Sequence, residues 1–238
     1  MPCYGGKTSP RSADVPLCWR KSVAPNEEIE LVSAMKKKLL RNLLPLALVL
    51  FAGCASSPPS RFYVLTPEAS GKQLANTSDL TLGVGPVRLV AYLERPQIVS
   101  RDSANQLRVE EFERWGGTLE GNITWVLAEN LSRLLGTGAV VTYPWERVVE
   151  TDYQIALDIR RFDPGSDGQV QLSVQWRVIG KDGGELYAIE RSEFSEPVAG
   201  SGFAAQVAAQ SRVLARLSEA IAARIGVLRS GSRSLSDS

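Results

Sequence analysis

Two segments in the second half of the chain alternate apolar and polar residues with a period of two. They cover residues 152–162 and 169–178, and the turn sequence DPGSDG, residues 163–168, lies between them. This alternation is typical of antiparallel strands with one face in the core and the other in water. The residues expected on the buried face are Tyr153, Ile155, Leu157 and Ile159, followed by Val170, Leu172, Val174, Trp176 and Val178.

Two other segments carry apolar residues at the spacing of an amphipathic helix. The first begins at Leu119 and ends near Leu135, where Gly136 and Gly138 provide a stop. The second runs over about residues 203–225, and many alanines flank its apolar stripe. We therefore expect two helices that each bury one face.

Shorter apolar runs predict further strands, and Gly, Pro, Asn or Asp residues separate most of them. The runs cover residues 61–67, 80–89, 97–101, 107–112, 139–144 and 185–194. The third and fourth flank DSANQ and are expected to form a hairpin, whereas the alternation of the last run is irregular. The expected fold class is α+β, a largely antiparallel sheet with two amphipathic helices packed on one face.

The N-terminal part has the layout of a bacterial lipoprotein signal. The basic sequence MKKKLLRN, residues 35–42, leads into an apolar run over 43–51 that is too short to cross a bilayer, and Ala52, Gly53 and Cys54 follow. Small residues before a cysteine are typical of a cleavage site at which the thiol receives diacylglycerol. Cys54 is therefore the predicted lipidation site, and two or three acyl chains would give stable anchoring.

This layout also predicts the domain boundaries. Residues 35–53 are the expected signal peptide, 54–60 a Pro-rich tether, 61–228 one domain and 229–238 a disordered tail. Residues 1–34 are expected to be untranslated, with Met35 as the true start, or to be disordered. With that start Cys54 is the one cysteine of the mature chain, so no disulfide forms within it.

Composition narrows the functional classes. Residues 54–238 carry 19 basic and 22 acidic side chains, a net charge of −3, which gives no electrostatic basis for binding nucleic acid. The chain has no histidine, the usual general base and zinc ligand. The neighbouring carboxylates Glu110, Glu111, Glu113 and Glu120 show no spacing that selects a catalytic pair. We therefore expect no enzyme, with no catalytic residue, metal or cofactor.

One predicted loop contains apolar and aromatic side chains, which are unusual in a segment that is exposed to water. The sequence AYLERPQIVSR begins at Ala91, and Tyr92 and Leu93 stand there beside charged residues. Trp115, in the sequence FERWGG, is a similar case. Such residues either fold back onto the core, which physical considerations alone favour, or form a docking surface for a partner.

The same residues resemble a known family. The sequence VGPVRLVAYLERPQIVSR, followed by EEFERWGGTLEGNITWVLAENLSRLL, is similar to the PqiC family of ABC-type transport auxiliary lipoproteins, associated with MCE-type intermembrane lipid transport. The family pattern is matched here by Tyr92, Leu93, Glu94, Arg95, Pro96 and Gln97, and by the pair Arg114 and Trp115. Ala91, where a proline is common, and Glu94, where an aspartate is common, depart from it.

The resemblance implies a lipid-anchored lipoprotein on the periplasmic face of the outer membrane, a location that Ala55 after the cysteine also favours. The implied partners are an MCE-domain tunnel protein and its inner-membrane partner, together with further copies of the same chain. The eight matched residues are then expected to bind a partner. Two alternatives remain open: a carrier that holds lipid in a groove between sheet and helices, and an activator of a cell-envelope synthase.

Overall fold

The computed structural model describes residues 32–42, 58–69, 79–145, 149–181 and 186–236. The chain divides into two compact units, the first ending at Ser57 and the second beginning at Pro58. In the first unit a helix covers residues 32–42, so residues 32–34, expected to be disordered or untranslated, are helical. Cys54 and residues 1–31 lie outside the described residues. Within the described ranges, no helix is both long and apolar enough to cross a membrane.

The second unit contains a small sheet of three strands in the order β1-β4-β3. Its strands are β1 (Arg61–Tyr63), β3 (Gln97–Ser103) and β4 (Gln106–Trp115). β3 and β4 form the expected antiparallel hairpin, and β1 pairs with β4 in parallel. The first strand is shorter than its apolar run predicted, since it ends at Tyr63 and an extended segment continues to Ala69.

A larger sheet has five strands in the order β5-β2-β6-β7-β8. They are β2 (Leu82–Leu89), β5 (Val140–Thr142), β6 (Tyr153–Pro164), β7 (Gln169–Gly180) and β8 (Leu186–Pro197). β6, β7 and β8 form the antiparallel meander that the alternating pattern predicted. The pairing of β2 with β6 contains a register shift between Val84 and Val87, where Gly85 and Pro86 lie between the paired residues.

The sheets are mixed rather than largely antiparallel, which corrects one detail of the predicted fold. β2 is parallel to both β5 and β6. Parallel neighbours require a long crossover, and the chain provides one because it builds β3, β4 and a helix before it returns beside β2. The alternation of apolar and polar residues within a strand does not indicate which strands become neighbours or whether they are parallel.

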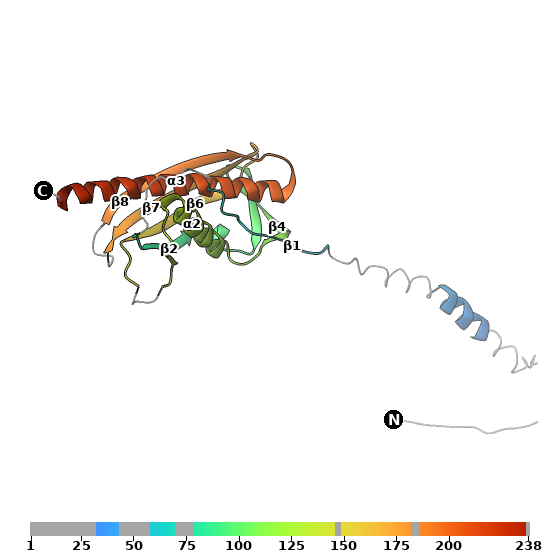
Figure 1. The fold of residues 1–238 in the computed structure, drawn as a ribbon. Coiled ribbons are helices and arrows are strands. Elements are labelled where there is room, and N and C mark those ends of the chain that lie inside the picture. Colours follow the sequence, from blue (N-terminus) through green and yellow to red (C-terminus); the bar gives the residue numbers. More distant parts are fainter. Residues whose placement is uncertain (1–31, 43–57, 70–78, 146–148, 182–185, 237–238) are drawn as a thin grey trace, which may run out of the picture. The chain divides into compact units, whose positions relative to one another are not determined.

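The two predicted helices are α2 (Leu119–Leu135) and α3 (Gly202–Ser236). α2 contacts β2 and β5, α3 contacts β6, β7 and β8, and the helices also contact each other. Figure 1 shows α3 running along the large sheet with α2 beside it. The α+β class is therefore confirmed. The core lies between the helices and the predicted buried faces of β6 and β7, on which Ile155, Leu157, Val174 and Val178 are fully buried.

α3 continues through residues 229–236, which the polar composition had predicted to be a disordered tail. Contacts hold the helix where this segment begins: Leu228 packs against the core, and the guanidinium of Arg229 pairs with the carboxylate of Asp79. The helix also explains the irregular pattern of β8. Glu190 forms an ion pair with Arg224 of α3, so this partly buried position on the sheet is acidic instead of apolar.

Candidate functional site

The matched sequence AYLERPQ lies between the two sheets in the chain and makes a compact turn. A 3-10 helix, η1 (Ala91–Leu93), begins directly after β2, and the backbone N–H groups of Leu93, Glu94 and Arg95 bond to nearby carbonyls within the turn. Pro96 ends the turn, since Gln97 is already the first residue of β3. The backbone N–H of Trp115 donates to the carbonyl of Pro96 over 2.7 Å, which fixes the end of the turn to β4.

Leu93 and Trp115 are core residues. Their exposed fractions are 3% and 4%, and both belong to the hydrophobic cluster that includes α2 and the large sheet. Of the two alternatives for these side chains, folding back onto the core is therefore the one observed. Burial on this scale stabilises the fold by about 1.5–3 kcal/mol for each large side chain. Neither side chain can contact a partner without leaving the core.

Tyr92 is held by a buried polar network. Its hydroxyl donates to Oδ2 of Asp163 over 2.6 Å, and Asp163 is fully buried at the end of β6. Nε of Arg101 and Nε of Arg161 donate to the other carboxylate oxygen over 3.2 and 3.1 Å. Burial, followed by the hydrogen bond to Asp163, raises the pKa of Tyr92 to about 12. The network ties the turn to both sheets.

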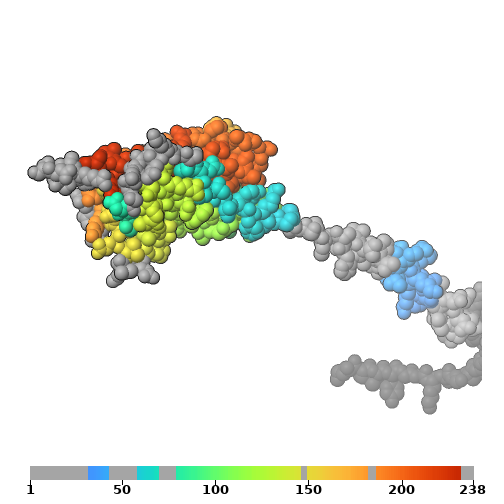
Figure 2. Space-filling model, viewed as in Figure 1, coloured from blue at the N-terminus to red at the C-terminus, as the bar shows by residue number. Residues whose placement is uncertain are grey.

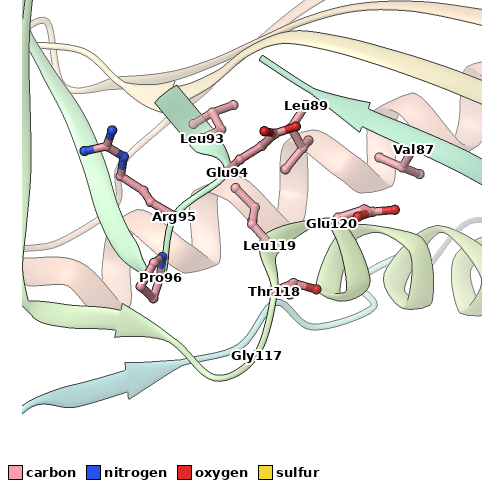
Figure 3. A pocket seen from close by; sticks show the side chains of 10 residues that line it. All are labelled: Val87, Leu89, Leu93, Glu94, Arg95, Pro96, Gly117, Thr118, Leu119 and Glu120. Atoms are coloured by element: carbon pink, nitrogen blue, oxygen red, sulfur yellow. The ribbon is translucent and has the colours of Figure 1, made fainter. Parts of the chain in front are cut away.

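Glu94, Arg95 and Pro96 are exposed, as is Ala91 at the start of the turn. Behind them lies a hollow of about 330 Å³ between the turn, the end of β2 and the start of α2. In Figure 3 the side chain of Glu94 points toward Leu89, whereas Arg95 points away from Val87 and Glu120. The lining is apolar at its base and charged at its rim: Val87, Leu89, Leu93 and Leu119 on one side, and Glu94, Arg95 and Glu120 on the other.

The start of α2 is fixed locally. Oγ1 of the N-cap residue Thr118 accepts from the backbone N–H of Gly121 over 3.1 Å, and Gly136 in the left-handed region ends the helix where the sequence predicted. Gly117, with φ of 119°, turns the chain from β4 into the helix. One wall of the hollow is therefore set by a capped helix and the other by the network around Asp163.

The remaining matched residues lie on β3 and β4. Gln97 is opposite Arg114 in the hairpin register, and Arg114 forms an ion pair of 3.0 Å with Glu111. Arg114 and Trp115 thus point to opposite faces of β4, the first partly exposed and the second buried. The structure brings the eight matched residues into one region, but it gives them two roles, a supporting core and an exposed rim.

A second polar cluster was not foreseen from the sequence. Glu113 on β4 is 5% exposed, it is paired by Arg61 of β1, and it accepts a 2.7 Å hydrogen bond from the hydroxyl of Tyr63. The hydrogen bonds from Arg61 hold the pKa of the Glu113 carboxyl below its ordinary value. The cluster fastens β1, the first strand after the predicted tether, to the domain. The sequence gives one sign of this burial: Glu113 lies two residues before Trp115, so both side chains are on the same face of the strand.

No catalytic arrangement emerges in the part of the chain that the structure describes. That part contains no group of three or more His, Cys, Asp or Glu residues able to hold a metal ion. Of the carboxylates considered from the sequence, Glu111 and Glu113 are occupied by ion pairs with arginine.

Comparison with known families shows which family the chain belongs to. Residues 63–222 match the family described as the ABC-type transport auxiliary lipoprotein component. The chain belongs to this family. The members are lipoprotein components of transporters, which agrees with a protein of the cell envelope that works with a membrane-associated partner. The curated proteins contain no match to the chain.

Solved structures show the same fold. A crystal structure titled only as an uncharacterized protein superposes with a TM-score of 0.56 at 20% identity, covering 71% of this chain and 99% of its own. Protein XCC0632 from Xanthomonas campestris, of family DUF330, gives a TM-score of 0.55 at 17% identity, covering 75% of this chain and 97% of its own. At sequence identities of 20% and 17%, these two superpositions show a shared fold and nothing further.

Proposed function

We propose that this auxiliary lipoprotein is a non-catalytic docking component of an MCE-type intermembrane lipid transport system. Lipid on Cys54 anchors it to the periplasmic face of the outer membrane. The domain binds the end of the envelope-spanning MCE tunnel protein, which in turn reaches an inner-membrane partner. Family membership supports the transport role, and the lipobox sequence supports the anchor.

The observation that carries the docking proposal is the exposed turn on a braced support. Glu94, Arg95 and Pro96 project from a segment whose neighbours Tyr92 and Leu93 are fixed in the network and the core. A preorganised surface loses little conformational entropy on binding, which favours affinity. The hollow behind the rim can accept an apolar side chain of the partner while the charged rim sets its orientation.

Packing in the core favours docking over lipid carriage. The carrier alternative needs an apolar groove between the large sheet and the helices. In the described part of the domain, fully buried side chains from α2, α3 and the sheet fill that space, among them Leu127, Leu131, Leu217 and Ile221. The hollow at the turn, about 330 Å³, is near the lower limit for small-ligand sites.

Crosslinking and purification from the native envelope tests the docking surface. Reversing the charge in Arg95→Glu should reduce the recovered MCE protein about tenfold, a loss of about 1.4 kcal/mol in binding free energy, because the rim then repels its former contact. The matched control is Arg191→Glu, which reverses the charge of an exposed arginine on β8. Equal recovery with both variants, or no MCE protein with the wild type, would contradict the proposal.

A further inference from the structure

Four large apolar side chains lie exposed where β1, β4 and α2 meet. Phe62 is 66% exposed, Val64 55%, Trp125 52% and Phe112 36%. Single exposed apolar residues are common on protein surfaces, but three aromatic rings and a valine in one region are unusual. None of the four is among the eight matched residues, although Phe62 is opposite one of them, Arg114. The four side chains adjoin the proposed docking rim, since Gly117 and Thr118 line the hollows of both.

Strand register relates Phe62 to Phe112, and a shared hollow relates Val64 to Trp125. Phe62 is opposite Arg114 in the register of β1 and β4, and Phe112 precedes Arg114 by two positions, so all three point to the outer face of the small sheet. Val64 and Trp125 line a shallow hollow of about 510 Å³. Figure 2 shows residues 58–69 in cyan at the surface, beside the green and yellow-green residues of β4 and α2.

Glycines keep this surface open. Gly116, Gly117 and Gly121 line the same hollow as Val64 and Trp125. A Cβ atom on Gly116 would lie 3.0 Å from Cγ1 of Val64, so a side chain there would displace the valine. The backbone thus leaves the apolar side chains of β1 and α2 uncovered.

Both arginines next to Phe62 are engaged in ion pairs. Arg61 is paired with Glu113, and Arg114 is paired with Glu111. Neither guanidinium is therefore available to recognise a charged group of a partner. The surface suits an occupant that is apolar with a polar boundary, and the interface of a phospholipid bilayer has that chemistry. Trp concentrates there because its ring is apolar and its N–H can meet water, and Phe rings supply apolar area that can enter the acyl boundary.

The length of the tether brings this surface to the bilayer. Phe62 is eight residues after Cys54, and a fully extended chain covers at most about 3.6 Å per residue, so Phe62 lies within about 30 Å of the lipidated residue. A tether this short gives the surface a high effective concentration at the bilayer. We propose that Phe62, Val64, Phe112 and Trp125 contact the phospholipid surface and orient the domain upon it. This inference rests on the lipid anchor of the proposed function.

Fluorescence quenching by lipid tests the contact. The full lipoprotein, extracted from membranes, is placed in phosphatidylcholine vesicles with and without brominated acyl chains. Trp115 and Trp176 are buried in the core, whereas Trp125 is half exposed. Trp125→Phe should therefore lower the quenching by about twofold or more, because the ring at the interface is replaced by one that the measurement does not detect. Trp145→Phe is the control and should leave most of the quenching in place.

The possible results of this experiment distinguish the lipid contact of the four side chains from the lipid anchor on Cys54. If the acylated protein binds vesicles but Trp125→Phe leaves the quenching unchanged, the surface does not contact lipid and this inference fails alone. A different result is a wild type that shows no quenching but self-associates, with Trp125→Ser abolishing that self-association. This result would assign the surface to a second copy of the chain and would also overturn the inference. A native protein without acyl chains would overturn the anchor and this inference together.

Discussion

At the scale of single residues, Asp163 connects parts of the chain that are far apart in sequence. It receives hydrogen bonds from Tyr92 in the turn, Arg101 on β3 and Arg161 on its own strand. A fully buried carboxylate is tolerated because these donors replace its hydration. The function of Tyr92 in this account is to brace the rim, so its substitution should affect stability before it affects binding.

The raised pKa of Tyr92 gives a pH-dependent prediction. The phenol is neutral in the folded protein up to a pKa of about 12, and an unfolded tyrosine ionises near 10. The hydroxyl therefore contributes stability that is complete below pH 10 and is lost as the pH rises from 10 to 12. Denaturant unfolding of the wild type and Tyr92→Phe should give a difference in unfolding free energy that shrinks over this range. A difference that stays constant would contradict the network.

At the scale of elements, helix side chains hold the extended segment after β1. Asn122 of α2 accepts from the backbone N–H of Leu65, Ser211 of α3 from that of Thr66, and Asn130 of α2 from that of Ala69. Asn130 also donates to Ser218 over 3.3 Å, so it joins the segment to both helices. The segment thereby obtains its hydrogen bonds without a partner strand.

Asn130→Ala should lower the free energy of unfolding by about 2 kcal/mol. The substitution leaves the backbone N–H of Ala69 and the hydroxyl of Ser218 without this partner in a fully buried site. Glu129→Ala is the control on the same helix, since its ion pair with Arg133 is exposed and contributes at most about 1 kcal/mol. Chemical denaturation compares them, and equal losses would contradict the bridging role of Asn130.

Most of the elements could be predicted because periodicity is a local property. The alternation in β6 and β7 and the stripe of α2 identified both the element and its buried face. The order of the strands was not accessible in this way, because β2 becomes parallel to β5 only through a crossover of some fifty residues. The run over residues 185–194 looked irregular because the partner of Glu190 is Arg224 of α3.

The candidate site was predictable in position but not in the roles of its residues. The sequence located the turn, yet it could not separate the buried Leu93 and Trp115 from the exposed Arg95. Asp163 was interpreted only as part of a turn, since its donors come from positions 92 and 101 and leave no local signal. Trp125 lies outside the apolar stripe of α2, and only its neighbour Val64, in the segment after β1, gives it significance.

At the scale of the whole molecule, the proposed function depends on the place where the domain is held. If the domain works by docking, as proposed, its anchor determines which partners it can reach. The transporter family, the signal sequence and the exposed apolar surface after the tether all agree with attachment to a membrane.

Metabolic labelling with palmitate, followed by purification of the protein from its native envelope, is the most direct test of that attachment. The account predicts a labelled wild-type protein whose mature chain begins at Cys54 and that fractionates with outer membranes. The Cys54→Ala variant should carry no label and stay unprocessed. An unlabelled wild-type protein, recovered free in the periplasmic fraction, would contradict the account.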